Sequence, residues 1–195
     1  MKIMRQLKTV AVILVFLMMS CAGSPYIKNY EPVNAFLETK KIDRTRKYIL
    51  QADKEPNLLG LRIFNGGEGL EHIVEDIDYT DGLFAKKHWE KIYKRYAYDT
   101  IKRYWKEEDF PGYNLILEKG RGLIMKGAFL DKYVNNLNYK ILIISEPMYY
   151  RNRKYIIFYF NIVDFGNSNE PQVVIMKKEN KKWIVVKVIG DYVYY

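Results

Sequence analysis

The chain has 195 residues and a formal net charge of +9, with 49% hydrophobic residues and a single cysteine. This length suits one ordinary domain and is short for two. A single cysteine excludes an internal disulfide framework, so the fold depends on its apolar core. Eighteen tyrosines and three tryptophans supply much of that core, because aromatic rings bury large areas and keep a polar group.

The first twenty residues have the pattern of a secretory leader. Lys2, Arg5 and Lys8 precede an unbroken apolar run over residues 10–19. This run is well short of the ~20 residues that a helix needs to span a bilayer, but it suits the apolar region of a signal peptide. Cleavage after this leader would remove its three cations and leave the mature chain at +6.

The residues around the cysteine favour a lipid anchor. Met18, Met19 and Ser20 stand directly before Cys21. This arrangement resembles the lipobox of bacterial lipoproteins, in which a signal peptidase cuts before the cysteine and the new N-terminus is lipidated. Met18 stands where the family usually has Leu. The resemblance implies two acyl chains on Cys21, enough for stable anchoring at ~0.8 kcal/mol per buried methylene. Cleavage after Ala22, or a retained leader, is the alternative.

The resemblance also implies a location and a class of partner. Ala22 follows the cysteine, where enteric lipoproteins kept at the inner membrane have Asp, so delivery to the outer membrane is expected. The expected partners are the membrane, through the acyl chains on Cys21, and an unknown envelope protein or ligand. Export past the inner membrane argues against nucleic acid, despite the basic charge. No cofactor is predicted.

The domain organisation follows from this leader: residues 1–20 form the signal peptide, 21–30 a lipidated tether, and 31–195 one α+β domain. Glu31-Pro32 suits the first turn of a helix, because proline is favoured there. Asp43 is expected to cap a short helix over residues 44–51.

Residues 58–64 have the apolar run of a short strand, and glycines make 65–69 a loop. The stretch that follows is acidic. Asp76 to Asp81 has a faint likeness to a calcium loop, but the spacing is wrong, so no metal site is predicted. A pair of carboxylates for glycoside chemistry could come from Glu71, Glu75 and Asp78.

The clearest pattern in the mature chain predicts a long amphipathic helix over residues 84–108. Its aromatic and aliphatic residues recur at three- and four-residue steps. Two interpretations of its basic surface are open: contact with anionic lipid or a nucleic-acid backbone, or simple solvation above a sheet. Solvation is favoured, because the strands that follow need a cover. The candidates for lipid contact are Lys87, Lys91, Lys94, Arg95 and Lys102.

Beyond the helix the period changes to that of strands, with short links that predict an antiparallel meander curved around the long helix. The expected strands are 113–118, 123–129, 139–145, 154–165, 172–178 and 182–189. Residues 119–122 and 178–181 are expected as tight turns, and 156–160 is apolar enough for a central strand covered on both faces. This half loosely resembles cystatin-like and nuclear-transport-factor-2-like folds, which host both enzymes and binding modules.

The sequence offers little for catalysis. Cys21 is committed to lipid, only His72 and His88 could act as imidazole bases, and no Gly-x-Ser-x-Gly elbow occurs. No catalytic residue is therefore predicted. The leading hypothesis is a non-enzymatic envelope lipoprotein that binds a partner or ligand. The alternatives are a glycan-acting enzyme that uses the acidic stretch, and a peripheral module that binds anionic lipid.

Overall fold

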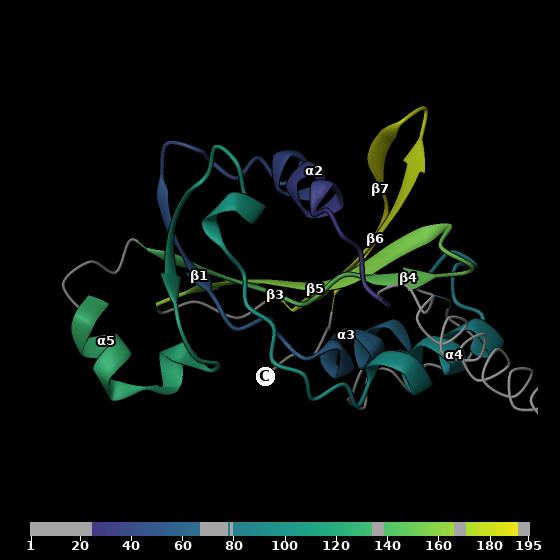
Figure 1. Cartoon of the computed structure of the whole chain (residues 1–195), viewed down its shortest axis with the longest axis horizontal. Helices are drawn as coiled ribbons and strands as arrows, with labels where there is room; N and C mark the ends of the chain where they lie inside the picture. The colour runs from purple at the N-terminus through teal and green to yellow at the C-terminus, as the bar shows by residue number, and fades with distance from the viewer. Residues whose placement is uncertain (1–24, 67–77, 79, 134–138, 166–170, 191–195) are drawn as a thin grey trace, which may run out of the picture.

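The computed structural model describes residues 25–66, 78, 80–133, 139–165 and 171–190. Within these ranges a seven-stranded mixed sheet lies between two helical layers (Figure 1). Its strands are β1 (Lys47–Gln51), β2 (Asn114–Glu118), β3 (Lys140–Ile144), β4 (Met148–Tyr150), β5 (Tyr155–Asp164), β6 (Gln172–Glu179) and β7 (Lys182–Gly190).

Helix α2 covers one face of the sheet, whereas α3, α4 and α5 lie on the other (Figure 1). The helices are α2 (Glu31–Thr39), α3 (Asn57–Phe64), α4 (Lys86–Tyr96) and α5 (Gly127–Tyr133), with short 3-10 turns η2 (Glu107–Asp109) and η3 (Leu123–Met125). The α+β class predicted from the sequence is confirmed. No helix in the described ranges is both long and apolar enough to cross a membrane.

The strand order is β2-β1-β3-β5-β6-β7, with β4 paired beside β3 along the same edge of β5. The pairs made by β5, and the β6–β7 hairpin, are antiparallel. The prediction of a wholly antiparallel meander is wrong, because β1 runs parallel to both β2 and β3. Parallel neighbours need long crossovers, and here the crossovers carry the helices.

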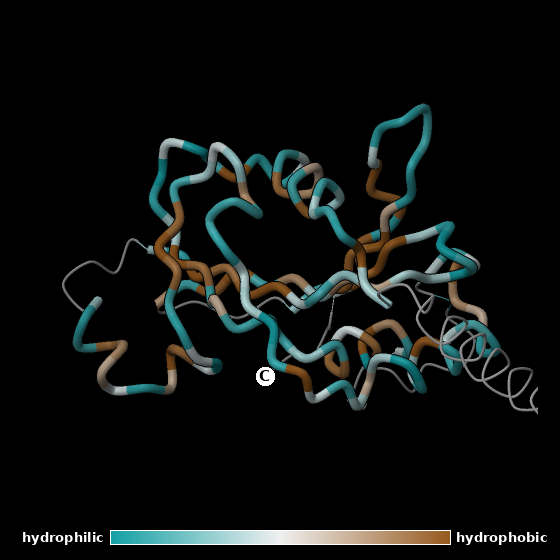
Figure 2. The backbone as a smooth tube through the Cα atoms, viewed as in Figure 1, coloured by the Kyte–Doolittle hydropathy of each residue, from teal (hydrophilic) through white to brown (hydrophobic). Residues whose placement is uncertain are grey.

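Strand β5 is central, and the prediction that both its faces are covered is confirmed. Ile156, Phe158 and Phe160 pack in the cluster that includes α2, while Ile157 and Tyr159 pack with α3 and α4. Figure 2 shows hydrophobic residues concentrated along the strands of the sheet. Because both faces are apolar, the chain must supply helices to both layers.

Two short elements exchange their predicted types. Residues 47–51 form β1 rather than a helix, because Asp43 does not cap a helix. Its carboxylate accepts hydrogen bonds from the backbone N–H (2.8 Å) and hydroxyl (2.7 Å) of Thr45, which closes a turn.

Residues 57–64 form α3 rather than a strand, because a short apolar run suits either structure. Gly60 lets α3 approach β5 closely, since a Cβ there would lie 3.3 Å from the Tyr159 Cβ.

The predicted helix over residues 84–108 is too long, because α4 ends at Tyr96. Beyond it, the Asp99 carboxylate accepts a hydrogen bond from the Ile101 N–H (3.0 Å) and turns the chain. The Trp105 N–H then donates to the Ala52 carbonyl (2.8 Å). Tyr96 and Trp105 are buried in different clusters on opposite faces of the sheet. The apolar residues over 84–108 are therefore divided between the two faces of the sheet, and a single straight helix could not reach both faces.

The predicted strand over residues 123–129 is also wrong, since this stretch forms η3 and the start of α5. Gly120 and Gly122 have positive φ angles, and the Gly120 N–H bonds to the Asp53 carboxylate (2.5 Å) rather than closing a hairpin. The other predicted strands are confirmed as β2, β3, β5, β6 and β7. The turn after β6 is tight without glycine, because Asn180 and Lys181 adopt left-handed backbone conformations.

The start of the described chain packs into the domain. Tyr26 and Ile27 lie in the range expected to be tether, and both are buried. The Tyr26 hydroxyl donates to the Asp99 carboxylate (2.7 Å), and the Tyr96 hydroxyl donates to the Pro25 carbonyl (2.7 Å). The leader and Cys21 lie outside the described residues.

Three tyrosines on or against this segment, Tyr26 and Tyr96 buried and Tyr30 half-buried, give a pH-dependent stability. Burial is the largest cause that raises the pKa of Tyr26, Tyr30 and Tyr96 above the ordinary tyrosine value. The folded state therefore holds these protons more tightly than the unfolded chain does. Their contribution is fully present below about pH 10 and is lost as the pH rises above it.

We expect the free energy of unfolding to fall with pH above about 10, and to fall less steeply in Tyr26→Phe. Urea denaturation at a series of alkaline pH values measures both slopes. Tyr104→Phe, at a half-exposed ring, is the control variant. An unchanged slope in Tyr26→Phe would contradict the assignment.

Candidate functional site

A buried ion pair joins the loop after β1 to the break between β3 and β4. The Lys54 ammonium lies 2.6 Å from the Glu146 carboxylate, and each side chain is only 5% exposed. The Tyr30 hydroxyl accepts a hydrogen bond from Lys54 (2.5 Å) and donates one to Glu146 (3.0 Å). Buried charges need such partners, because an unpaired charge in the interior costs several kcal/mol.

Aromatic rings enclose the cation of this pair. The Lys54 ammonium lies 3.9 Å from the centroid of the Trp105 ring and 4.2 Å from that of Tyr30, distances suited to cation–π attraction. Burial lowers the pKa of Lys54, and the neighbouring Glu146 carboxylate opposes this effect. Tyr30 is only partly buried and reaches the surface, so it links the ion pair to the groove beside it.

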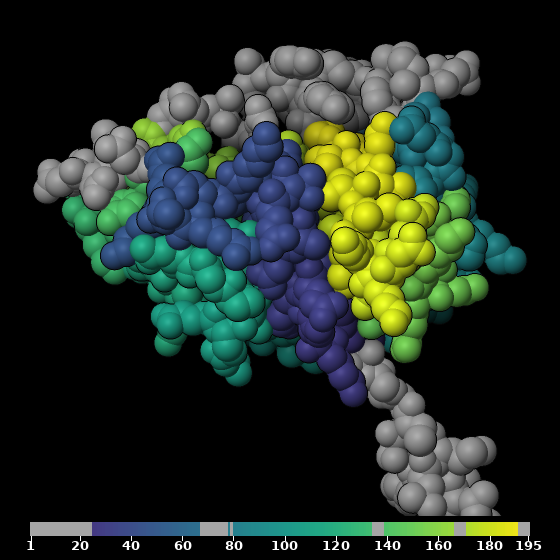
Figure 3. All heavy atoms as spheres, turned by 90° about the horizontal axis from the view of Figure 1, so that it is seen from above, coloured from purple at the N-terminus to yellow at the C-terminus, as the bar shows by residue number. Residues whose placement is uncertain are grey.

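The groove beside Tyr30 has a volume of about 660 Å³ and is the candidate site. It is formed by the N-terminus of α2, the turn η2 and the tip of the β6–β7 hairpin. Figure 3 shows the purple N-terminal residues of the domain beside the yellow hairpin. The lining residues are Lys28, Asn29, Tyr30, Glu31, Asn34, Ala35, Glu38, Glu108, Asp109, Pro111, Lys182 and Trp183.

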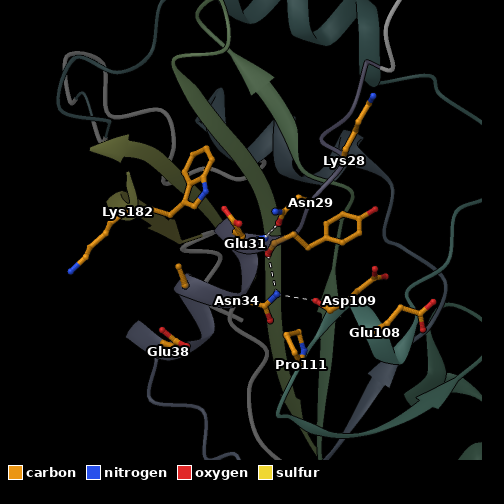
Figure 4. Close-up of a pocket in the computed structure, with 12 residues that line it drawn as sticks. Lys28, Asn29, Glu31, Asn34, Glu38, Glu108, Asp109, Pro111 and Lys182 are labelled. Carbon is orange, nitrogen blue, oxygen red and sulfur yellow. Dashed lines mark hydrogen bonds between the residues drawn. The ribbon is translucent and has the colours of Figure 1, made fainter. Parts of the chain in front are cut away.

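Asn34 holds two walls of the groove together. Its amide donates hydrogen bonds to the Asp109 carbonyl (2.8 Å) and the Tyr30 carbonyl (3.2 Å). These bonds fix the orientation of the amide and leave its buried oxygen without a hydrogen-bond partner. In Figure 4, Asn34 and Glu31 lie between Glu108 and Asp109 on one side and Glu38 and Lys182 on the other.

The groove is acidic on a basic protein. Its lining includes four carboxylates and two lysines, whereas the whole chain carries +9. Hydrogen bonding to Asn29 and the charge of Lys178 keep the pKa of Glu31 below its usual value. Hydrogen bonding to its own backbone and the charge of Lys106 do the same for Glu108. Both side chains are therefore ionised at neutral pH, and the lining favours a cationic ligand over an anionic one.

A second hollow, of about 460 Å³, also borders the segment over residues 28–31. It shares Lys28, Asn29, Glu31 and Trp183 with the groove. Its remaining lining comes from Tyr26, Ile27, Pro32, Tyr149, Arg153, Ile156 and Lys178. Trp183 thus borders both hollows, so its ring can contact an occupant of either one.

The residues proposed for glycan chemistry do not come together in the described part of the chain. Glu71, Glu75 and His72 lie outside it. Asp78 accepts hydrogen bonds from Thr80 and from the Gly82 N–H, and the bonds from Thr80 are the largest cause that lowers its pKa. A carboxyl held ionised in a turn suits capping rather than proton donation.

The remaining candidates fall on the other helical layer. Among the described residues no three His, Cys, Asp or Glu side chains group as metal ligands, and the stretch over 76–81 is only partly described. His88 lies on α4 with its ring edge-on to Tyr150, at 6.1 Å between centroids. Lys87, Lys91, Lys94 and Arg95 are exposed on α4, whereas Lys102 lies in the loop beyond it.

Comparisons with protein-family models, with curated proteins and with solved structures found no match for this chain. The resemblance to cystatin-like and nuclear-transport-factor-2-like folds therefore stays a prediction.

Sequence reasoning missed the groove because its walls are far apart in the chain. Asn34 and Asp109 are 75 residues apart, and neither stands in a motif. Lys54 and Glu146 are separated by 92 residues, and no local pattern distinguishes either of them from a surface charge. Glu31 stands at the predicted start of a helix and Lys182 and Trp183 stand in a predicted strand, but no local pattern brings them together.

The buried ion pair predicts a large cost when one partner is removed. Glu146→Gln leaves the Lys54 charge buried without its counter-ion, so we expect a loss of ~3–5 kcal/mol in the free energy of unfolding. The double variant Lys54→Met/Glu146→Gln should lose less, because no unpaired charge remains. Urea denaturation followed by tryptophan fluorescence measures both.

Lys106→Met is the matched control. Its ion pair with Glu108 spans 3.5 Å and is largely exposed, so the change should stay within ~0.5 kcal/mol. The interpretation fails if Glu146→Gln is no more destabilised than this control, or if the double variant is worse than the single.

Proposed function

We propose that this chain is a lipid-anchored protein of the bacterial cell envelope, held at the outer membrane through acyl chains on Cys21. Its α+β domain binds an envelope partner or ligand in the groove and catalyses no reaction. The observation that carries the binding role is the groove itself, with aromatic rings, an amide fixed by two hydrogen bonds and an excess of carboxylates. The leader pattern and the position of Cys21 support the anchor.

The lining of the groove indicates the chemistry of the partner. Carboxylates such as Glu31 and Glu108 attract cationic groups, and the rings of Tyr30 and Trp183 can stack on aliphatic or cationic side chains. A basic peptide segment or an amine-bearing ligand fits both features. Pairing of Glu38 with Arg44 and of Glu31 with Lys178 (3.7 Å) at exposed positions leaves these carboxylates able to exchange partners.

The anchor is tested by comparing the wild type with Cys21→Ser in a bacterial host. We expect the wild type to lose residues 1–20, gain the mass of its acyl groups and fractionate with the membrane, while the variant does none of these. Intact mass spectrometry and fractionation give the two readouts. A wild-type protein that is soluble and unacylated would contradict the proposal.

The groove is tested with a short oligolysine peptide as the probe, and with tryptophan fluorescence as the readout. We expect Glu108→Gln and Asp109→Asn each to weaken binding roughly two- to fivefold, since a partly exposed ion pair contributes ~0.5–1 kcal/mol. Glu90→Gln, at an exposed position on α4, is the control and should bind like the wild type. Equal loss in all three variants would show non-specific attraction rather than binding in the groove.

A further inference from the structure

The loop that follows α4 exposes three large aromatic or aliphatic side chains. Tyr98 is 72% exposed, Ile101 67% and Tyr104 48%, all within seven residues. Exposed apolar side chains that are grouped, rather than scattered, mark surfaces that contact a partner or a membrane. We call residues 98–104 the exposed loop.

The exposed loop is held firmly at both ends. Tyr96 before it and Trp105 after it are each only 2% exposed. The Arg103 carbonyl accepts a hydrogen bond from the Lys54 N–H (3.0 Å), and the Asp99 carboxylate closes a turn onto the Ile101 N–H (3.0 Å). The backbone of the loop is therefore fixed, and the Tyr98 ring lies edge-on to the ring of Tyr93 on α4, with their hydroxyls 3.2 Å apart.

The first described residues of the chain lie against this loop. The Tyr26 hydroxyl donates to the Asp99 carboxylate (2.7 Å), and the Arg103 guanidinium lies 4.2 Å from the Tyr26 ring centroid. The Tyr96 hydroxyl, directly before the loop, donates to the Pro25 carbonyl (2.7 Å). The exposed loop and the start of the folded domain are thus neighbours in space.

The contact between Pro25 and the start of the exposed loop limits the distance between that loop and a lipid anchor at Cys21. Cys21 precedes Pro25 by four residues. At 3.3–3.6 Å per residue, even a fully extended chain would span at most about 14 Å. An acylated Cys21 would therefore keep the exposed loop close to the membrane surface.

Cations flank the apolar side chains of the loop. Arg95 and Lys102 are exposed on either side of Tyr98. Arg153, exposed in the β4–β5 turn, lies close enough to Tyr96 that its charge, like that of Arg95, lowers the pKa of that hydroxyl, although burial has the larger, opposite effect. Exposed tyrosine and aliphatic side chains with cations beside them are typical of protein surfaces that lie in the interfacial region of a membrane.

We propose that the exposed loop is a second membrane contact, in which Tyr98 and Ile101 enter the headgroup region of a bilayer that contains anionic phospholipid. Arg95 and Lys102 then face the lipid phosphates. The inference rests on the lipid anchor of the proposed function and adds an orientation: the domain is held by the acyl chains and by this loop together.

This surface differs from the basic face of α4. The exposed positions of α4 carry charged side chains, among them Lys87, Lys91 and Lys94. Charge alone attracts a protein to anionic lipid without inserting it, whereas exposed tyrosine and isoleucine add burial of apolar area. The exposed loop therefore fits a bilayer better than the helix face does.

The test uses the full, acylated chain in vesicles of phosphatidylethanolamine and phosphatidylglycerol. Acylation blocks the thiol of Cys21, so Thr100→Cys supplies one free thiol at an exposed position within the loop. A fluorophore on that thiol is exposed to a lipid that carries a quencher near its headgroup. Met125→Cys, 85% exposed in η3, is the matched control.

We expect quenching of the label at Thr100→Cys and none at Met125→Cys. Equal quenching at both, or none at either, in protein that is acylated and floats with the vesicles would overturn the exposed-loop contact and leave the lipid anchor intact. Protein that is neither acylated nor bound to vesicles would overturn the anchor, and the contact with it.

Two pairs of double variants, each built on the Thr100→Cys background, separate the sources of the contact. Tyr98→Ser/Ile101→Ser should lose the quenching, whereas Met125→Ser/Leu130→Ser, which removes other exposed apolar side chains, should keep it. Arg95→Glu/Lys102→Glu should also lose it, and Lys87→Glu/Lys91→Glu should not. If the helix variant alone loses the quenching, α4 is the membrane contact and the inference is wrong.

Discussion

The two-sided burial of β5 is the constraint on which the rest of this structure depends. Ile156 and Phe158 face one helical layer, and Ile157 and Tyr159 face the other, so the sheet cannot leave either face to solvent. Side chains as large as these each stabilise the fold by ~1.5–3 kcal/mol when fully buried. With no disulfide available in the chain, covering both faces is the main source of stability, and it forces the chain to pass repeatedly between layers.

The passage from α4 to η2 shows the consequence of this constraint. Tyr96 ends the helix in one layer, and Trp105 enters the core of the other only nine residues later. The segment between them has to run over the surface, which leaves Tyr98 and Ile101 exposed. The same crossing brings Trp105 over Lys54, so the aromatic enclosure of the buried cation and the exposed loop have one structural origin.

The groove, the ion pair and the start of the domain are likewise connected through Tyr30. Its hydroxyl contacts Lys54 and Glu146 in the interior, while its ring borders the groove. Moving this ring would break its hydrogen bonds to the buried ion pair, so we expect Tyr30 to keep its position when a ligand binds in the groove. The lining of the groove begins at Lys28, and residues 25 and 26 contact Tyr96 and Asp99 at the exposed loop. Lipid attachment at Cys21 would therefore hold both surfaces near the membrane anchor.

The sequence by itself determined the class of fold, the strands β2, β3, β5, β6 and β7, the central and doubly covered place of β5, and the basis for expecting a lipid anchor at Cys21. These features depend on local patterns: an apolar run, a period of two, and a cysteine that follows an apolar leader and a serine. Only the tertiary structure decided that residues 47–51 form a strand and 57–64 a helix, that α4 ends at Tyr96, and that β1 pairs in parallel. Short apolar segments suit a helix or a strand equally, so the layer that each must cover selects its form. The groove and the pairing of Lys54 with Glu146 join residues far apart in the chain, and no local pattern carries that information.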